Sequence, residues 1–375
     1  MSSNGQDILI VGAGVIGLSL GWRLLGAGAS VTIVERGKEG AASRAAAGML
    51  APTAEAHFEE TELLAMGRTS LAMYPEFVAE LEEYTGLDVD YRREGTLVVG
   101  LDRDDAAALD HIHRYHRELG LGAERLSAAQ AHELEPGLSP NIHTALFCPD
   151  DHQVDPRRLV DALTRAFKKA GGRLLFGLAV EEIQRDGQRL QGVRTSTGAT
   201  LNADQVVICA GAWSRTIEGL PPEDHFPLRP VRGQMLAIVL GEPVLCRHVI
   251  RAPDAYLVPK SDGRLIIGAT SEEVGFDDRL TAGGVFELLR GAWETMPAIA
   301  ESPILEMWTG FRPVTLDNLP VMGPSAGLDR LWYAAGHGRN GILLTPWTAA
   351  TMVEALQGET DIPYLDALSA SRFSR

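Results

Sequence analysis

Residues 7–35 read DILIVGAGVIGLSLGWRLLGAGASVTIVE, and this stretch decides the fold. Two β-type runs, 7–11 and 30–35, enclose an apolar helical pattern over about 15–27, which predicts a βαβ unit. The turn after the first run has the spacing G-x-G-x-x-G, with its glycines at Gly12, Gly14 and Gly17. In this setting the first glycine allows a tight turn, the second lets a pyrophosphate approach the backbone, and the third packs the helix on the strand.

An acidic residue completes this pattern. Glu35 ends the second β-type run and follows Gly17 by 18 positions, the difference between 35 and 17. A carboxylate in this place accepts hydrogen bonds from the ribose hydroxyls of an adenosine, and the start of the helix offers the positive end of its dipole to phosphates. The alternative is a glycine-rich turn without a ligand, which the complete context of strand, turn, helix and acid disfavours. We therefore expect a dinucleotide, either NAD or FAD, at this turn.

Two later segments favour FAD over NAD. The run NADQVVICAGAWS (202–214) predicts another strand that leads into a turn of small residues, and GHGRNGIL (336–343) supplies a further glycine-rich turn near the end of the chain. A cofactor contacted near residue 15 and again near residue 340 spans a whole domain. The extended FAD molecule suits that span.

Composition indicates a globular chain of two domains. Its 375 residues exceed one ordinary core, and 45% hydrophobic with 22% charged residues is typical of soluble proteins. The net charge of −16 disfavours nucleic acid as a partner. No apolar run reaches the roughly 18 residues of a membrane span, and the N-terminal MSSNGQ lacks the basic segment of a signal peptide. We expect a cytoplasmic protein that does not bind membranes.

Cysteine and histidine spacing predicts neither disulfides nor a metal site. The three cysteines are odd in number and far apart, as is typical of reduced thiols: Cys148, Cys209 and Cys246. The run DHIHRYHRE contains His111, His113 and His116, but no two of them are four residues apart as in helical zinc motifs. We interpret these histidines as part of a solvated helix face.

The remaining chain alternates helical patterns with β-type runs. Helices are expected at about 59–85, 103–119, 127–134, 155–172, 281–296 and 342–357, and residues 41–55 are expected to form a long turn. The runs GQMLAIVL, HVIRA, AYLVPK and RLIIGAT predict an antiparallel sheet. Because these runs interrupt the dinucleotide-type segments, each domain is expected to consist of separated pieces of chain.

Five longer segments resemble a known family: VGAGVIGLSL (11–20), SRAAAGMLAPTAE (43–55), AYLVPKSDGRLIIGAT (255–270), WTGFRPVTLDNLPVMG (308–323) and AAGHGRNGILLTP (334–346). The family is that of the FAD-dependent amine oxidases, which includes D-amino acid oxidase, sarcosine oxidase and glycine oxidase. The chain is most similar to the bacterial glycine oxidases of thiamine biosynthesis. The resemblance implies an α/β plus α+β fold of the glutathione-reductase-like flavoprotein type. A discontinuous Rossmann-type FAD-binding domain would comprise 1–55, 150–225 and 308–375, and an antiparallel-sheet substrate domain 56–149 and 226–307.

The resemblance also implies site residues. Noncovalent FAD would contact the glycine motif and, in addition, Val15, Ile16, Glu35, Arg36, Ser43, Arg44, Ala47, Gly48, Met49, Val180, His337, Gly338, Arg339, Asn340, Gly341, Ile342 and Leu343. Arg312 would bind the substrate carboxylate, Arg339 would assist through its backbone or side chain, and Tyr256 would line the pocket. Three positions depart from glycine oxidases, which can carry His, Met and Gly where this chain has Asp254, Ser271 and Asn318.

The residues themselves allow alternatives to these roles. Arg312 follows an apolar run that contains Trp308 and Phe311, where a buried guanidinium would need a carboxylate partner, but a lone arginine is more often a solvated surface charge. Tyr256 can serve ordinary strand packing, and Met49 can fill a gap in the core. Arg339 and a helix beginning near residue 341 are expected beside the flavin, where they would stabilise negative charge on its reduced form.

We therefore expect oxidative deamination of glycine or a related small or N-substituted amino acid. The products would be an oxo acid (glyoxylate from glycine), ammonia or an amine, and hydrogen peroxide. Dioxygen would be the electron acceptor, and the enzyme would be a homo-oligomer. The alternatives are a D-amino acid or sarcosine oxidase, a flavin dehydrogenase that passes electrons to an acceptor other than oxygen, and a non-catalytic dinucleotide-binding protein. Arg312 and Arg339 together disfavour the last of these.

Overall fold

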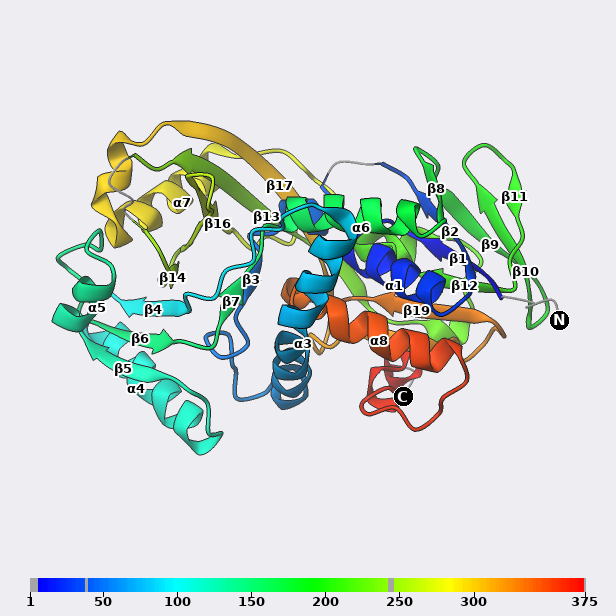
Figure 1. Cartoon of the computed structure of the whole chain (residues 1–375), viewed down its shortest axis with the longest axis horizontal. Helices are drawn as coiled ribbons and strands as arrows, with labels where there is room; N and C mark the ends of the chain where they lie inside the picture. Colours follow the sequence, from blue (N-terminus) through cyan, green and yellow to red (C-terminus); the bar gives the residue numbers. More distant parts are fainter. Residues whose placement is uncertain (1–5, 38–39, 242–245, 374–375) are drawn as a thin grey trace.

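The computed structural model of the chain describes residues 6–37, 40–241 and 246–373 and contains two large sheets with helices packed against them (Figure 1). The expectation that residues 1–5 carry no signal segment lies outside the described residues. The predicted mixture of a Rossmann-type sheet with an antiparallel sheet is confirmed.

The first large sheet is built around the βαβ unit that the glycine motif predicts. Five of its six strands run parallel, and β18 is antiparallel at one edge. In spatial order the strands are β18 (Val321–Pro324), β19 (Leu331–Ala335), β12 (Gln205–Ile208), β1 (Asp7–Val11), β2 (Ser30–Glu35) and β8 (Arg173–Phe176). Ile8 and Ile10 of β1 are buried in the core on one face, and Leu9 and Val11 in the core on the other. Both faces are covered, as is usual for parallel sheets.

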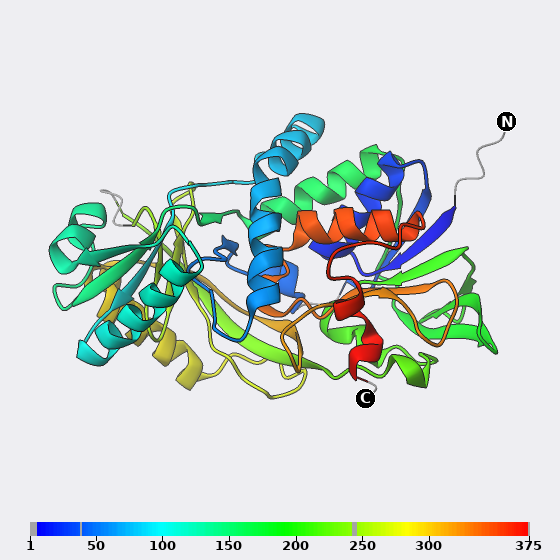
Figure 2. The same ribbon diagram turned by 90° about the horizontal axis from the view of Figure 1, so that it is seen from below.

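Helices cover one face of this sheet and a small sheet covers the other (Figure 2). The helices are α1 (Val15–Gly26), α3 (Thr61–Thr85), α6 (Pro156–Lys169) and α8 (Thr345–Leu356). The small antiparallel sheet contains β9 (Val180–Asp186), β10 (Arg189–Thr195) and β11 (Thr200–Leu201), and its β9–β10 hairpin was predicted from the turn RDGQ.

The second large sheet has eight strands and lies on the left in Figure 1. In order they are β17 (Ile304–Thr315), β13 (Leu228–Val239), β16 (Arg264–Gly268), β15 (Tyr256–Pro259), β14 (Val249–Arg251), β4 (Thr96–Gly100), β6 (Thr144–Cys148) and β5 (Glu124–Ser127). All neighbours pair antiparallel except β14 and β4. Three helices pack on this part: α4 (Arg103–Glu118), α5 (Ala128–Leu134) and α7 (Ala282–Thr295).

Two predictions about local structure are wrong: the start of the last helix and the long turn at 41–55. The last helix begins at Thr345 rather than near 342, and a short 3-10 helix, Gly338–Asn340, precedes it. Pro346 explains the later start, because its fixed φ and missing N–H suit the first turn of a helix. Residues 41–55 are also more regular than a long turn: they contain α2 (Ala42–Ala45) and β3 (Met49–Leu50), which pairs with β7 (His152–Gln153).

The interpretation of His116 as a solvated residue is wrong as well. His116 is buried, and burial lowers the pKa of its imidazole. The end of α4 packs on the preceding loop, where the hydroxyl of Tyr115 donates to the carbonyl of His57 at 3.1 Å. The ring of Phe58 lies 4.2 Å from that of Tyr115. With Leu109 and Tyr115, His116 is one of the buried residues of α4, so it lies on the side of the helix that packs against the protein.

The two-domain division stays a proposal, and helix α3 bears on it. Although α3 was expected in the substrate domain, its apolar face lies in the same core as α1, α6 and α8. Its Ser70 hydroxyl donates to the carbonyl of Leu343 at 2.6 Å, and its Tyr74 hydroxyl donates to the carbonyl of Ile342. Helix α3 therefore holds the segment 338–344 in place through hydrogen bonds to its backbone carbonyls.

All three cysteines are free, and the structure buries each of them. Within the described ranges, no helix is both long and apolar enough to cross a membrane.

Candidate active site

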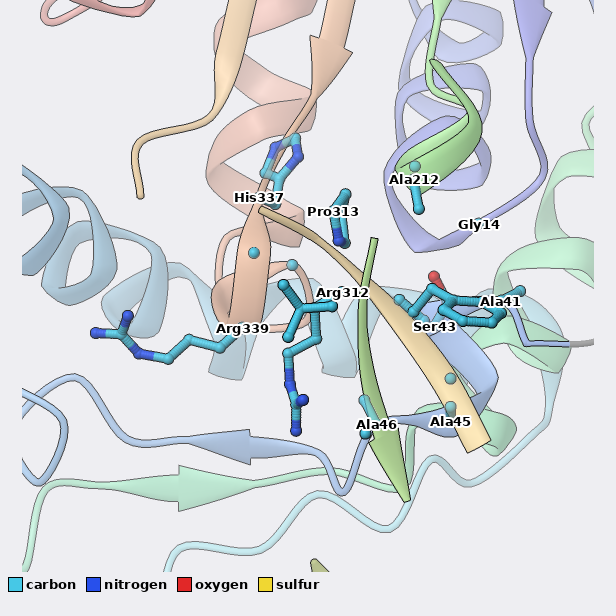
Figure 3. A pocket seen from close by; sticks show the side chains of 18 of the residues that line it. Gly14, Ala41, Ser43, Ala45, Ala46, Ala212, Arg312, Pro313, His337 and Arg339 are labelled. Carbon is cyan, nitrogen blue, oxygen red and sulfur yellow. The ribbon is translucent and has the colours of Figure 1, made fainter. Parts of the chain in front are cut away.

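A cavity of about 690 Å³ lies between the two large sheets, with walls from β1, β2 and β19 on one side and β13, β15 and β17 on the other (Figure 3). Most residues expected at the site line it: Gly12, Gly14, Val15, Ile16, Glu35, Arg36, Ser43, Ala47, Gly48, Met49, Val180, Tyr256, Arg312, His337, Gly338, Arg339, Asn340, Gly341 and Ile342. The topology thus brings segments from both ends of the chain to one cavity.

Three expected residues do not line it. A Cβ on Gly17 would lie 2.0 Å from the carbonyl oxygen of Gly12, so Gly17 serves close packing of the helix on the strand. The guanidinium of Arg44 pairs with Asp161 at 2.6 Å on the surface. Leu343 is buried behind the turn, where its carbonyl accepts from Ser70.

At one end of the cavity, the glycine turn and Glu35 form a polar cradle. Gly12 has φ +109°, and a Cβ there would lie 2.5 Å from the carbonyl oxygen of Cys209. The Ser43 hydroxyl accepts from the backbone N–H of Val15 at 3.1 Å, so it lies at the amino end of α1. The carboxylate of Glu35 accepts from the N–H groups of Ala13 at 2.6 Å and Gly37 at 2.8 Å, which holds it beside the turn.

The segment before β3 forms one wall of the cavity, and a buried lysine holds it in place. Gly48 has φ +91°, and a Cβ there would lie 1.9 Å from the carbonyl oxygen of Val154. The ammonium group of Lys260 donates to the carbonyls of Ala47 and Val154, each at 2.9 Å. Burial lowers the pKa of Lys260 to about 8. Lys260 was not predicted from the sequence, where its only signal is a lysine following the apolar run YLVP.

Arg312 and Tyr256 lie across the second sheet at positions where neighbouring strands carry glycine. A Cβ on Gly233 of β13 would lie 2.7 Å from Nη1 of Arg312, and a Cβ on Gly268 of β16 would lie 2.6 Å from the hydroxyl of Tyr256. Nη1 of Arg312 donates to the carbonyl of Thr270 at 3.0 Å. Neither glycine was predicted from the sequence, although glycine inside a strand is a signal of close approach.

Burial raises the pKa of the Tyr256 hydroxyl, an effect that the neighbouring Arg312 opposes. The phenol is therefore protonated at neutral pH and is available as a hydrogen-bond donor. His337 lies on the same cavity, and burial lowers its pKa to about 3, so its imidazole is neutral. Its Nε2 lies 3.1 Å from the hydroxyl of Thr348.

Arg339 differs from Arg312 in its charge environment. Its Nη2 pairs with Glu60 and its Nε lies 3.3 Å from Glu55. The positive charge expected at this turn is therefore present, but two carboxylates, those of Glu55 and Glu60, are paired with it. In Figure 3 its side chain extends away from Gly14 and Ser43, in a different direction from Arg312.

The three departures from the family pattern lie at the mouth or near it. Asp254 pairs with Arg290 at 3.0 Å, and Ser271 is exposed. Asn318 has φ +61°, so asparagine adopts the left-handed conformation in which the family can carry glycine, and its amide donates to Glu60 at 2.8 Å. In the part of the chain that the structure describes, no group of three acidic, histidine or cysteine residues could hold a metal ion.

The cavity fits the predicted FAD. It runs from Glu35, at the carboxyl end of β2, past the amino end of α1 to Tyr256 and Arg312 in the second sheet. An extended dinucleotide can follow this path, since glycines replace side chains where its pyrophosphate would approach. A ligand confined to the glycine turn would make no contact with the second sheet.

Comparison with known proteins agrees with this geometry. The model of the family described as FAD dependent oxidoreductase matches residues 7–355. A bifunctional ThiO/ThiG protein of Trichormus variabilis is 36% identical over 374 residues, which cover 99% of this chain but 55% of that protein. The chain thus spans about half the length of this relative.

A second relative matches over nearly its whole length. Glycine oxidase of Geobacillus kaustophilus is 35% identical over 353 residues, which cover 94% of this chain and 93% of that protein. The crystal structure of glycine oxidase from Geobacillus kaustophilus superposes with a TM-score of 0.91 at 34% identity, covering 98% of this chain and 99% of that one. With the family model matching most of its length, the chain belongs to the family of FAD-dependent oxidoreductases.

Proposed function

We propose that the chain is an amine oxidase of the glycine oxidase type, which acts on glycine or a related small or N-substituted amino acid. With glycine, the substrate, dioxygen and water give glyoxylate, ammonia and hydrogen peroxide. The observation that carries this proposal is Arg312, which lines the cavity and has no carboxylate partner in the described ranges. A substrate carboxylate supplies the bidentate partner that such a guanidinium needs.

The chain's own residues position the substrate. Arg312 binds the carboxylate, and the protonated hydroxyl of Tyr256 donates to it or to the amine. Enclosure between the two sheets disfavours an ammonium ion, so the amine is held in its neutral, oxidisable form. Bound FAD supplies the two-electron oxidation of the amine to an imine, which water then hydrolyses.

The remaining site residues hold the cofactor. Gly12, Gly14 and Ser43 would surround the pyrophosphate, and Glu35 would bind the adenosine ribose. The segment that ends in Met49 and the turn at 337–342 would face the ring system, and Lys260 fixes the first of these two walls. Similarity to glycine oxidase over 93% of that protein supports the assignment. Dioxygen as acceptor and a homo-oligomeric state are part of the same proposal.

Anaerobic mixing of the purified protein with single amines tests the proposal. Glycine, sarcosine, N-ethylglycine and D-alanine are added in turn, and loss of the visible flavin absorbance is followed. We expect bleaching by glycine or by an N-substituted glycine, and hydrogen peroxide after air is admitted. No bleaching by any of the four amines would refute the substrate class. Bleaching without peroxide would instead favour a dehydrogenase with another acceptor.

A further inference from the structure

The substrate end of the cavity contains a second arginine, Arg251, whose guanidinium already forms an ion pair with a carboxylate of the protein. Arg251 pairs in register with Tyr256 across β14 and β15, and its Nη1 is bound by the carboxylate of Glu55. Both residues line the cavity, and the side chain of Glu55 is 14% exposed. Arg312 lies on β17, which is on the opposite side of β15 from β14 in the strand order, and the charges of Arg312, Arg251 and Glu55 all act on the Tyr256 hydroxyl.

Glu55 is shared between two arginines. One of its carboxylate oxygens binds Arg251, and the other lies 3.3 Å from Nε of Arg339, which also pairs with Glu60. Three guanidinium groups therefore face two carboxylates, and Arg312 is left as the cation without an acidic partner within the described ranges. The charges of this end balance when one further carboxylate binds.

The backbone around Glu55 is fixed, so its carboxylate cannot easily move away. The N–H groups of Thr53 and Ala54 donate to the buried carboxyl of Asp151 at 3.1 and 3.0 Å. The N–H of Glu55 itself donates to the carbonyl of Ala51 at 3.0 Å. A ligand with two acidic groups would have to displace a carboxylate that is held both by its backbone and by its ion pairs.

We propose that Glu55 determines specificity by occupying Arg251, which limits the site to substrates with one acidic group. This inference rests on the proposed function and goes beyond it by naming the residue that excludes diacids. Without the Glu55 charge, Arg251 would be free to bind a second carboxylate of the substrate, one carried by the substituent on the amine nitrogen. Iminodiacetate is such a substrate: with dioxygen and water it would give glycine, glyoxylate and hydrogen peroxide.

Binding of two ethers tests the inference separately from catalysis. Methoxyacetate and oxydiacetate have the shapes of sarcosine and iminodiacetate but contain no amine, so their dissociation constants are measured from changes in the flavin spectrum of the holoenzyme. We expect Glu55→Gln to bind oxydiacetate roughly tenfold to a hundredfold more tightly than the unaltered protein, as for a newly formed bond to a charged group. Its affinity for methoxyacetate should change far less.

Glu60→Gln is the matched control. It removes the same charge from Arg339 but leaves Arg251 paired with Glu55, so it should show no gain for oxydiacetate. Adding Arg251→Gln to Glu55→Gln should abolish the gain. An equal gain in the Glu60 variant, or no gain in Glu55→Gln, would overturn the inference.

Arg251→Gln alone gives an independent reading if the Glu55 variant fails to fold. It leaves the Glu55 carboxylate less compensated beside the anion site, so methoxyacetate should bind about tenfold more weakly. Unchanged affinity would show that Glu55 does not face the ligand. These ether measurements do not depend on turnover, so a failure of the proposed oxidase activity, seen as absence of bleaching by amines, is recognised separately.

Discussion

Replacing Gly233 by alanine should weaken carboxylate binding and leave the fold intact. The new Cβ would lie 2.7 Å from Nη1 of Arg312 and 2.9 Å from Nη2, whereas ordinary contacts begin at 3.4 Å. The guanidinium must therefore move by about 0.7 Å, the difference between 3.4 and 2.7. Gly233 has no positive φ, so alanine brings no backbone strain, and the obstacle is the end of a flexible side chain.

The displacement has a predictable size in affinity. Moving the guanidinium stretches its bond to the carbonyl of Thr270 and misaligns the fork that receives the substrate carboxylate. Hydrogen bonds to charged groups contribute about 1.5–3 kcal/mol each, so losing one weakens binding roughly tenfold to a hundredfold. Thermal stability should change little, because no buried apolar contact is lost.

The assay compares methoxyacetate affinity, the KM for the best amine substrate, and the melting temperature. Gly283→Ala in α7 is the matched control, since a Cβ there meets nothing within 4 Å and its φ is not positive. We expect a raised dissociation constant and KM in the Gly233 variant only, with melting temperatures of both variants near that of the unaltered protein. Normal carboxylate affinity in a folded Gly233→Ala protein would refute the assignment of Arg312 as the anchor.

Three further predictions concern the cofactor end and pH. Gly14→Val should purify without flavin colour, because a Cβ there would lie 2.9 Å from the Ser43 hydroxyl in the pyrophosphate approach; a yellow, active variant would contradict this placement. Lys260→Met should bind FAD more weakly in a fluorescence titration, because two carbonyls of the cofactor wall lose their donor; unchanged affinity would show that the wall holds without it. His337→Asn should make stability less dependent on pH in acid. In the unfolded protein the imidazole takes up a proton below about pH 6.5, whereas burial in the folded protein prevents protonation until about pH 3. The stability of the unaltered protein therefore decreases as the pH is lowered from about 6.5 to about 3, and the asparagine variant should lack this decrease. Equal slopes of melting temperature against pH in the two proteins would contradict the burial argument.

Local patterns were sufficient for the nucleotide-binding part. The βαβ unit, the glycine spacing and Glu35 depend on residues close in sequence, so each could be recognised from periodicity and spacing. The error at the last helix has a local cause too. The apolar run from Ile342 continues the helical pattern backwards, but Pro346 occupies the first turn, and the preceding residues form a 3-10 helix and turns instead.

Residues that act across the sheet could not be identified in this way. Gly233 matters because the guanidinium of Arg312 lies against it, and Lys260 matters because it donates to the carbonyls of both Ala47 and Val154. Neither partner is near in sequence. Only the pairing of β13 with β17 and the approach of β3 to β7 show what these residues contact.

The two arginines illustrate the same limit for charge. Arg312 and Arg339 each follow a glycine-containing, apolar segment, and their neighbouring residues do not show which of the two is paired with carboxylates. The loop that carries Glu55 and Glu60 makes the difference, because it brings both carboxylates to Arg339 and none to Arg312. An arginine's ability to bind a substrate depends on which carboxylates the fold has already placed beside it, and here those carboxylates come from a segment some 280 residues away, as the separation of 279 between Glu60 and Arg339 shows. The availability of Arg312 is therefore a property of the tertiary structure, and Glu55 is the residue through which a single substitution can alter it.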